Sequence, residues 1–263
     1  MSLAYDRIGS GPPLVLLHGV GHRRQAWAAV ADLVAPHREL FLIDLPGHGE
    51  STPLITNGRP PLPVMLDAVV GLLDELGVHR PHFAGNSLGG RLSLDAGVAG
   101  RAATVTALSP AGFFRGRGEV VYARSVFRVM LAAGRLLQPL AGRLAASPAG
   151  RAVLFSAIVS RPGQLTAEQA VGDVEAFLRA TDALDAVLAS TDNFSGHIAA
   201  DVPVTIGWGA RDRLLPRRQA LLAKRLLPEA RFVLLPGCGH VPMTDDPQRV
   251  ADVLLAGSAA QPS

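Results

Sequence analysis

The stretch His82-Phe83-Ala84-Gly85-Asn86-Ser87-Leu88-Gly89-Gly90 decides the fold, because it predicts a strand that passes directly into a helix. Residues 82–84 end a short apolar run, and residues 88–98 carry leucine and alanine at helical spacing. A side chain at Gly85 or Gly89 would collide with the neighbouring strand or helix, which explains both glycines. Ser87 is therefore expected at a sharp turn, with its hydroxyl raised beside the free N–H groups of a helix N-terminus. An ordinary glycine-rich turn is the alternative interpretation.

Apolar runs on both sides of this stretch alternate with helical patterns. Residues 14–17 and 40–43 are continuous apolar runs, as expected for strands buried on both faces of a parallel sheet. The other predicted elements are strands at 4–8, 104–108, 202–208 and 231–235 and helices at 64–76, 217–227 and 247–255, with a proline-rich loop at 52–63. Alternating strands and helices indicate an α/β fold with a mostly parallel, doubly wound sheet.

The segment from Phe113 to Ala200 interrupts this alternation. It shows no strand pattern and reads as amphipathic helices separated by breakers at Gly116, Gly118, Pro139, Pro148 and Pro162-Gly163. We therefore expect a core made of residues 1–112 and 201–263 and a helical cap made of residues 113–200. We also expect the cap to control access while the sheet loops set the geometry of the triad.

The overall composition is that of a globular enzyme. The chain has 263 residues, of which 48% are hydrophobic and 18% charged, with a net charge of +3 and a pI near 9.7. Lys224 is the single lysine, and no basic run is interleaved with aromatic residues, which disfavours nucleic-acid binding. With Cys238 as the one cysteine, no intrachain disulfide can form. The first residues contain no apolar signal core, so we expect a cytoplasmic protein.

A serine hydroxyl needs a base to act as a nucleophile at neutral pH. His240 is the best candidate, because it lies in a glycine-rich loop just after the last predicted strand. The competing histidines are His18, His22, His37, His48, His79, His82 and His197. Of these, His18 and His48 also lie in loops at strand ends, so position alone does not exclude them, and a structural loop histidine is the alternative for His240.

A histidine base in turn needs an acceptor that fixes its tautomer. Asp212 follows the strand at 202–208 and is delivered to the same edge of the sheet. The rival acids are Asp44, Asp201, Asp245 and Asp246.

The negative oxygen of an acyl-transfer intermediate needs N–H donors. The amide of Leu88, next to Ser87, is one candidate. The second is the amide of Val20, in the glycine-rich loop that follows the first buried strand.

With these motifs in order, the chain resembles the α/β-hydrolase fold superfamily, in its capped serine hydrolase branch. The matching pieces are His18-Gly19, Asp44-Leu45-Pro46-Gly47-His48-Gly49-Glu50-Ser51, Gly85–Gly90, Gly209-Ala210-Arg211-Asp212 and Gly239-His240-Val241-Pro242, which span nearly the whole chain. The resemblance implies Ser87 as nucleophile, His240 as base and Asp212 as its partner. A serine at position 87 argues against haloalkane dehalogenases and epoxide hydrolases, which carry aspartate there. The Gly85–Gly90 segment is also similar to carbon–carbon bond hydrolases, which usually have tryptophan where this chain has Val241.

The predicted cap has two parts of opposite charge. Residues 113–161 contain eight arginines and one acid, whereas residues 162–200 contain one arginine and six acids. Either the two parts pair with each other, or the first forms a basic rim that attracts anionic substrates or a membrane surface. We expect Phe113, Phe114 and Met130 to line the substrate pocket.

These patterns predict a hydrolase of carboxylic esters that works through an acyl-enzyme without metal or cofactor. The substrate is expected to be a small molecule with an apolar acyl or ring group. Cleavage of a carbon–carbon bond in a ring-fission product is the alternative among enzymes, and a non-catalytic ligand receptor is the alternative outside them. The sequence does not indicate an oligomeric state.

Overall fold

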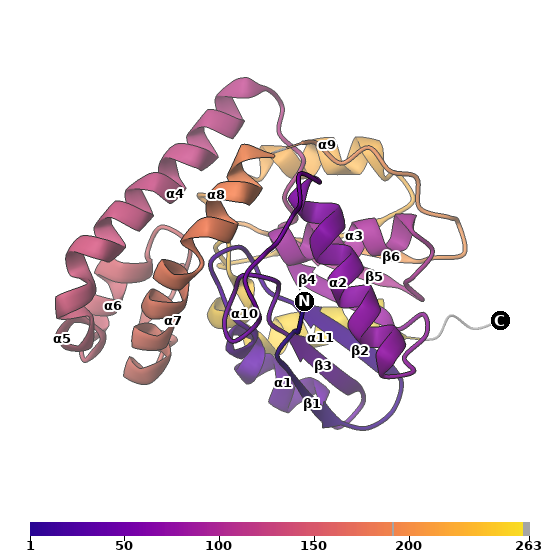
Figure 1. Ribbon diagram of the computed structural model, residues 1–263, viewed down its shortest axis with the longest axis horizontal. Coiled ribbons are helices and arrows are strands. Elements are labelled where there is room, and N and C mark those ends of the chain that lie inside the picture. The colour runs from indigo at the N-terminus through magenta and orange to yellow at the C-terminus, as the bar shows by residue number, and fades with distance from the viewer. Residues whose placement is uncertain (191, 260–263) are drawn as a thin grey trace.

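A seven-stranded sheet forms the centre of the molecule in the computed structural model, which describes residues 1–190 and 192–259 (Figure 1). The strand order is β1-β3-β2-β4-β5-β6-β7. β1 pairs with β3 antiparallel and all other neighbours are parallel, which confirms the predicted α/β fold. The strands are β1 Tyr5–Gly9, β2 Pro13–Leu17, β3 Glu39–Ile43, β4 His82–Asn86, β5 Val105–Leu108, β6 Val204–Gly209 and β7 Arg231–Leu235.

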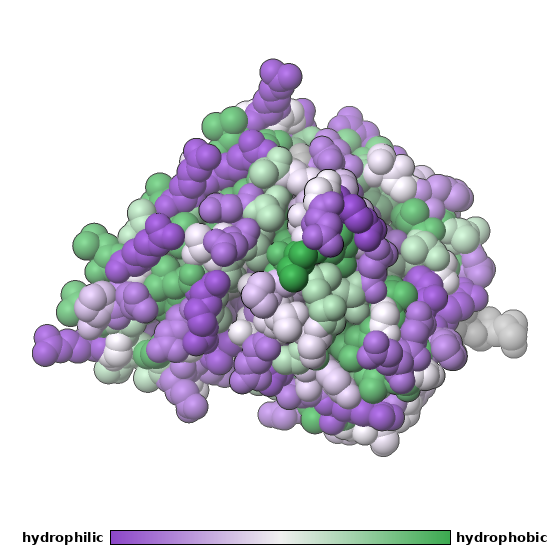
Figure 2. All heavy atoms as spheres, in the orientation of Figure 1, coloured by the Kyte–Doolittle hydropathy of each residue, from purple (hydrophilic) through white to green (hydrophobic). Residues whose placement is uncertain are grey.

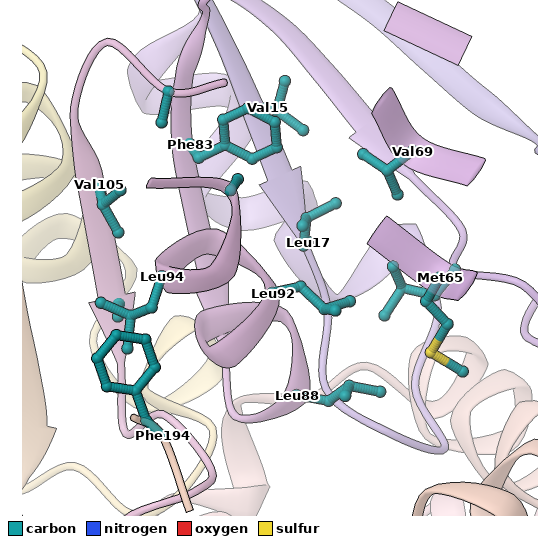
Figure 3. Close-up of a cluster of buried hydrophobic side chains, with 14 of the residues drawn as sticks. Val15, Leu17, Met65, Val69, Phe83, Leu88, Leu92, Leu94, Val105 and Phe194 are labelled. Carbon is teal, nitrogen blue, oxygen red and sulfur yellow. The ribbon is translucent and has the colours of Figure 1, made fainter. Parts of the chain in front are cut away.

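Helices cover both faces of the central strands, whose neighbouring residues point to opposite sides of the sheet. Val15 and Leu17 of β2 belong to one apolar cluster, shown in Figure 3, together with side chains of α2 (Pro61–Glu75) and α3 (Leu88–Val98). Leu14 and Leu16 belong to a second cluster, with α1 (Ala28–Val34) and α11 (Pro247–Gly257). The continuous apolar runs in the sequence thus follow from helices packed on both faces.

Helices fill the chain between β5 and β6. They are α4 Arg117–Leu137, α5 Ala141–Ala145, α6 Pro148–Phe155, α7 Ala167–Arg179 and α8 Thr181–Ala189, with 3₁₀ turns at Gln138–Leu140 and Pro162–Gln164. Figure 1 shows α4 to α7 projecting to the left of the sheet. We call residues 113–200 the helical insertion; its status as a separate cap remains a prediction.

Three details differ from the sequence prediction. Gly118 does not break a helix, because it lies in the first turn of α4. The loop expected at 52–63 ends early: α2 begins at Pro61, since proline fits the first turn, where no N–H partner is needed. A short helix, α10 (Pro242–Asp245), follows His240 and was not predicted.

The remaining helices are α9 (Arg218–Leu226) and a 3₁₀ turn at Arg24–Trp27. Within the residues that the structure describes, no helix has the length and apolar character needed to cross a membrane.

Candidate active site

Ser87 occupies the turn between β4 and α3. Its backbone has φ 55° and ψ −111°, a strained combination that residues other than glycine rarely adopt. Hydrogen bonds hold the turn on both sides: the amide of Ser87 donates to the carbonyl of Leu108 (2.9 Å), and its carbonyl accepts from the amide of Ala111 (3.0 Å). The chain therefore presents this hydroxyl in a fixed position at the carboxyl edge of the sheet.

The two motif glycines allow α3 to approach the sheet closely. A Cβ on Gly89 would collide with the backbone carbonyls of Leu17 and His18. A Cβ on Gly85 would collide with the backbone of Gly89 and Gly90. Both contacts involve backbone atoms, which cannot move aside as a flexible side chain can.

His240 and Asp212 form a buried pair at the ends of β7 and β6. Nδ1 of His240 lies 2.9 Å from Oδ2 of Asp212, and both side chains are almost fully inaccessible to solvent. The other carboxylate oxygen of Asp212 accepts from the amides of Leu214 (3.0 Å) and Leu215 (2.8 Å). These donors fix the carboxylate, which in turn orients the imidazole.

The helical insertion holds the backbone of the His240 loop. The carbonyl of Ile158 accepts from the amides of His240 (2.8 Å) and Val241 (3.1 Å). The carboxylate of Asp245 accepts from the amides of Gly239 (2.7 Å), Ser160 (3.1 Å) and Arg161 (2.6 Å). Residues 158–161 belong to the insertion, so the insertion holds the histidine loop in addition to the sheet loops that carry the triad candidates, a contribution that the sequence did not indicate.

Asn86 connects the serine to the histidine loop. Its Nδ2 donates to the carbonyl of His240 (2.9 Å) and to that of Leu108 (3.1 Å). Asn86 and Asp245 are the two positioning residues that sequence reasoning missed. A buried polar residue inside the Gly85–Gly90 motif was the only signal for Asn86, and Asp245 was considered only as a partner of the base.

Of the rival histidines, His18 and His48 are buried structural groups, whereas His22 lines the same cavity as Ser87. Nε2 of His18 accepts from the amide of Leu45 (3.0 Å), and the ring of His48 lies 5.2 Å from that of His18. Burial lowers the pKa of His48 to about 4 and that of His18 well below its usual range. Both rings are therefore neutral structural groups at neutral pH.

The rival acids are also engaged elsewhere. Asp44 is buried and accepts from the amide and the guanidinium of Arg24 (2.6 and 2.5 Å). Asp201 is exposed, and Asp246 caps the N-terminus of α11. Among the candidate acids, Asp212 is the one that contacts His240.

The candidate oxyanion donors lie on either side of Ser87. Leu88 is the first residue of α3, so its N–H has no partner within the helix. Val20 follows Gly19, where a Cβ would lie 3.3 Å from the Cβ of Ser87. The structure thus brings both amides next to the serine, while their role remains a prediction.

Two cavities meet at Ser87. The larger, of about 240 Å³, is lined by Ser87, His240 and Met130 and by other side chains of α4, α6 and α7. The smaller, of about 50 Å³, is lined by Ser87, Leu88 and Phe114. Val20, Ser87, Phe127 and Leu214 line both cavities.

Phe113 lies in neither cavity. It is fully buried, and its ring packs against Phe194 and Trp208 at centroid distances of 5.8 and 6.5 Å. The pocket role expected for Phe113 is therefore corrected to a core role, because its ring packs with Phe194 and Trp208 in the main apolar cluster. In the described part of the chain, no cluster of three or more His, Cys, Asp or Glu side chains is placed to hold a metal ion.

Fold and site together define an α/β-hydrolase, with a serine at the strand-to-helix turn and a histidine–aspartate pair on the following strands. The model of the alpha/beta hydrolase family matches residues 14–253, and the chain belongs to this family. It is a hydrolase.

Similar proteins include an esterase, an acetyltransferase component and a phospholipase. A pimeloyl-[acyl-carrier protein] methyl ester esterase from Xanthomonas campestris pv. campestris is 32% identical over 98% of this chain and 99% of its own length. A dihydrolipoyllysine-residue acetyltransferase component of an acetoin cleaving system from Pseudomonas putida is 30% identical over 94% of this chain, which spans only 63% of that protein. Among solved structures, a membrane phospholipase A described as a bacterial virulence factor superposes with a TM-score of 0.76 at 23% identity, covering 97% of this chain and 83% of that one.

Proposed function

We propose that this hydrolase cleaves carboxylic esters through an acyl-enzyme formed on Ser87. The observation that carries the proposal is the convergence of the strained serine and the His240–Asp212 pair on one cavity. The 32% identical relative is named as an ester hydrolase, which supports the same bond type here.

The reaction proceeds in two balanced halves. Oγ of Ser87 attacks the ester carbonyl while Nε2 of His240 accepts the hydroxyl proton. The amides of Val20 and Leu88 stabilise the negative oxygen of the tetrahedral intermediate. The carbon–oxygen bond to the alcohol then breaks, and His240 returns its proton to the leaving oxygen. Water repeats the sequence on the acyl-enzyme, releasing the acid and restoring the serine.

Asp212 acts on the base and not on the substrate. Its carboxylate accepts a hydrogen bond from Nδ1–H of His240, which leaves Nε2 free to accept the serine proton and stabilises the imidazolium that forms.

The two cavities divide the ester between them. The leaving oxygen must lie near Nε2 of His240, and His240 lines only the larger cavity. The alcohol part therefore occupies the cavity of about 240 Å³, and the acyl part occupies the cavity of about 50 Å³. This assigns a short acyl group and a larger apolar alcohol to the substrate.

Two isomeric esters test this orientation. Hexyl acetate and methyl heptanoate have the same formula, but only hexyl acetate places the long chain on the alcohol side. We expect a higher kcat/KM for hexyl acetate. A preference for methyl heptanoate would reverse the assignment and agree with the methyl ester esterase among the relatives.

The mechanism is tested by Ser87→Ala with p-nitrophenyl acetate. Turnover should fall by about 10⁴ or more, because the nucleophile is removed. Ser125→Ala on the exposed face of α4 is the matched control and should retain full activity. A folded Ser87→Ala protein with unchanged turnover contradicts the proposal.

The alternatives give different readouts. A carbon–carbon bond hydrolase would prefer a ring-fission dienoate over simple esters. A ligand receptor would not react with a fluorophosphonate that labels a control esterase.

The cytoplasmic location stays a prediction of the sequence.

A further inference from the structure

The outer face of α4 combines aliphatic and cationic side chains. Seven residues at helical spacing share this face, and all are exposed. We call this set the α4 stripe; it consists of Val121, Ser125, Arg128, Val129, Ala132, Arg135 and Leu136. Figure 2 shows hydrophobic and hydrophilic residues intermixed along the ridge that α4 forms at the left of the molecule.

The aliphatic members of the stripe are unusually accessible. Leu136 is 78% exposed, Val129 67% and Val121 60%. Leu140, just beyond α4, and Val153 on α6 continue the apolar surface. Extended exposed apolar surface of this kind marks an interaction site more often than a surface facing water alone.

The charge around the stripe has a single sign. From Val120 to Ala167 the chain contains six arginines and no acidic residue. Across residues 1–190 and 192–259, no ion pair joins Arg128, Arg135 or Arg143 to a carboxylate.

The acidic part of the insertion does not neutralise this surface. Its Asp173 pairs instead with Arg23 of the core, at 3.1 Å. Glu119 at the start of α4 pairs with Arg218 on α9. Pairing between the two parts of the insertion was one of the two alternatives, and neither of these two acids follows it. The arginines of the stripe can therefore attract an external anionic surface.

The larger cavity opens beside the stripe. Val129 belongs to the stripe and also lines the cavity, and the exposed Val153 lines it from α6. A molecule held against the stripe would thus lie next to the route to Ser87.

We propose that the α4 stripe docks on an anionic lipid surface. A single helix about 30 Å long, with protruding aliphatic side chains between arginines, fits a flat interface in which the aliphatics enter the acyl boundary and the arginines contact lipid phosphates. An acidic protein is the less favoured partner, because the aliphatic side chains project outward and form no groove to receive a complementary element. Once the stripe is docked, an amphiphilic ester passes from the lipid surface into the larger cavity; this part of the proposal rests on the proposed ester hydrolysis.

Vesicle flotation of the full-length Ser87→Ala protein tests docking without turnover. We expect binding to vesicles rich in phosphatidylglycerol to exceed binding to pure phosphatidylcholine vesicles by at least tenfold. The double variant Val121→Ser with Leu136→Ser should lower binding to the anionic vesicles about tenfold. The double variant Arg128→Gln with Arg135→Gln should lower it similarly and weaken its dependence on salt.

A second exposed leucine beside cations provides the matched control. Leu221 on α9 is 64% exposed, and Arg225 lies one turn away on the same helix. Leu221→Ser with Arg225→Gln should leave vesicle binding unchanged. Equal loss in this control, or no preference for anionic vesicles in the parent protein, overturns the proposal.

Two further outcomes separate the remaining possibilities. In one outcome, the protein binds soluble polyglutamate as tightly as it binds vesicles, with no change in Leu136→Ser. That result would point to an acidic protein as the partner and overturn lipid docking. With Ser87 intact, the stripe variants should hydrolyse p-nitrophenyl acetate at the parent rate, since none of the substituted residues lines the cavities. Absence of esterase activity in the parent would contradict the proposed function and leave the vesicle result to decide docking.

Discussion

The serine turn and the histidine loop position their side chains by different means. The turn at Ser87 is built from consecutive residues of β4 and α3, with glycines that admit the neighbouring backbone. The loop at His240 is instead held by Asn86 and by Ile158, more than 80 residues away along the chain. The difference teaches that the nucleophile is placed by local sequence, whereas the base is placed by contacts that exist only after the insertion has packed.

This comparison changes the role of the insertion. Helices α4, α6 and α7 line the larger cavity, and residues 158–161 hydrogen-bond to the His240 loop and to Asp245 beside it. The insertion therefore contributes to the position of the base as well as to access. Any motion of α4 relative to the sheet must leave these anchoring residues in place.

The largest effect is expected from Gly89→Ala at the serine turn. The new methyl group would meet the carbonyls of Leu17 and His18, and relieving that overlap should cost about 3 kcal/mol or more of unfolding free energy. Gly71→Ala in α2 is the matched control, because no atom lies near its added Cβ and alanine favours a helix. Urea unfolding measures both. Equal stability of the two variants would show that local close packing does not define the turn.

A smaller effect is expected from Asp245→Asn at the histidine loop. The amide side chain would present N–H groups to backbone donors, at a cost of about 2 kcal/mol. Because the base would be misplaced, kcat should fall about tenfold with KM nearly unchanged, in a variant that still folds. Asp246→Asn, which affects a helix cap and an exposed ion pair with Arg249, should leave kcat unchanged. An unaltered kcat in Asp245→Asn would show that the loop holds His240 without the insertion.

The buried histidines beneath the site should make stability depend on pH. Burial lowers the pKa of His48 to about 4, so the unfolded chain binds its proton near pH 6.5 and the folded chain does not. The unfolded state therefore gains protons first as pH falls, and stability that is fully present above pH 6.5 is lost toward pH 4. We expect His48 to contribute a loss of about 2 kcal/mol between pH 6.5 and 4.5.

The matched variants for this prediction are His48→Gln and His79→Gln, compared by urea unfolding at several pH values. The first should flatten the pH dependence, because it removes the buried group. The second should not, because His79 is exposed. Identical slopes in the parent and His48→Gln would contradict the assignment.

The smallest effects are expected from shortening one side chain that lines each cavity. Met130→Ala should weaken discrimination among alcohol chain lengths, and Phe114→Ala should weaken discrimination among acyl chain lengths, each by about 1 kcal/mol. Labelling by a small fluorophosphonate should persist in both, because the His240–Asp212 pair is held by its own hydrogen bond and by the amides of Leu214 and Leu215. If both variants changed the preference for the same part of the ester, either the alcohol or the acyl group, the two cavities would not divide the ester between them.

Periodicity and turn chemistry predicted most of the fold. The apolar runs at 14–17 and 40–43 became strands buried on both faces, and the helix expected from residue 88 is α3. Phe113 was misassigned because an aromatic residue after a strand has the same pattern whether it lines a pocket or joins the core. Asp245 was weighed only as a rival acid, because a single sequence does not reveal which backbone amides a carboxylate will meet.

The sequence by itself determined the alternation of strands and helices, the sharp turn at Ser87 and the position of Asp212 and His240 at strand ends. These features depend on residue type, spacing and chain direction, which are local properties. Tertiary structure alone decided that Ile158 and Asp245 hold the base and that two unequal cavities meet at the serine. It also decided that the aliphatic side chains of the α4 stripe face outward. Such outcomes depend on how distant segments compete for the same space and the same hydrogen-bond donors, and that competition is resolved only when the whole chain packs.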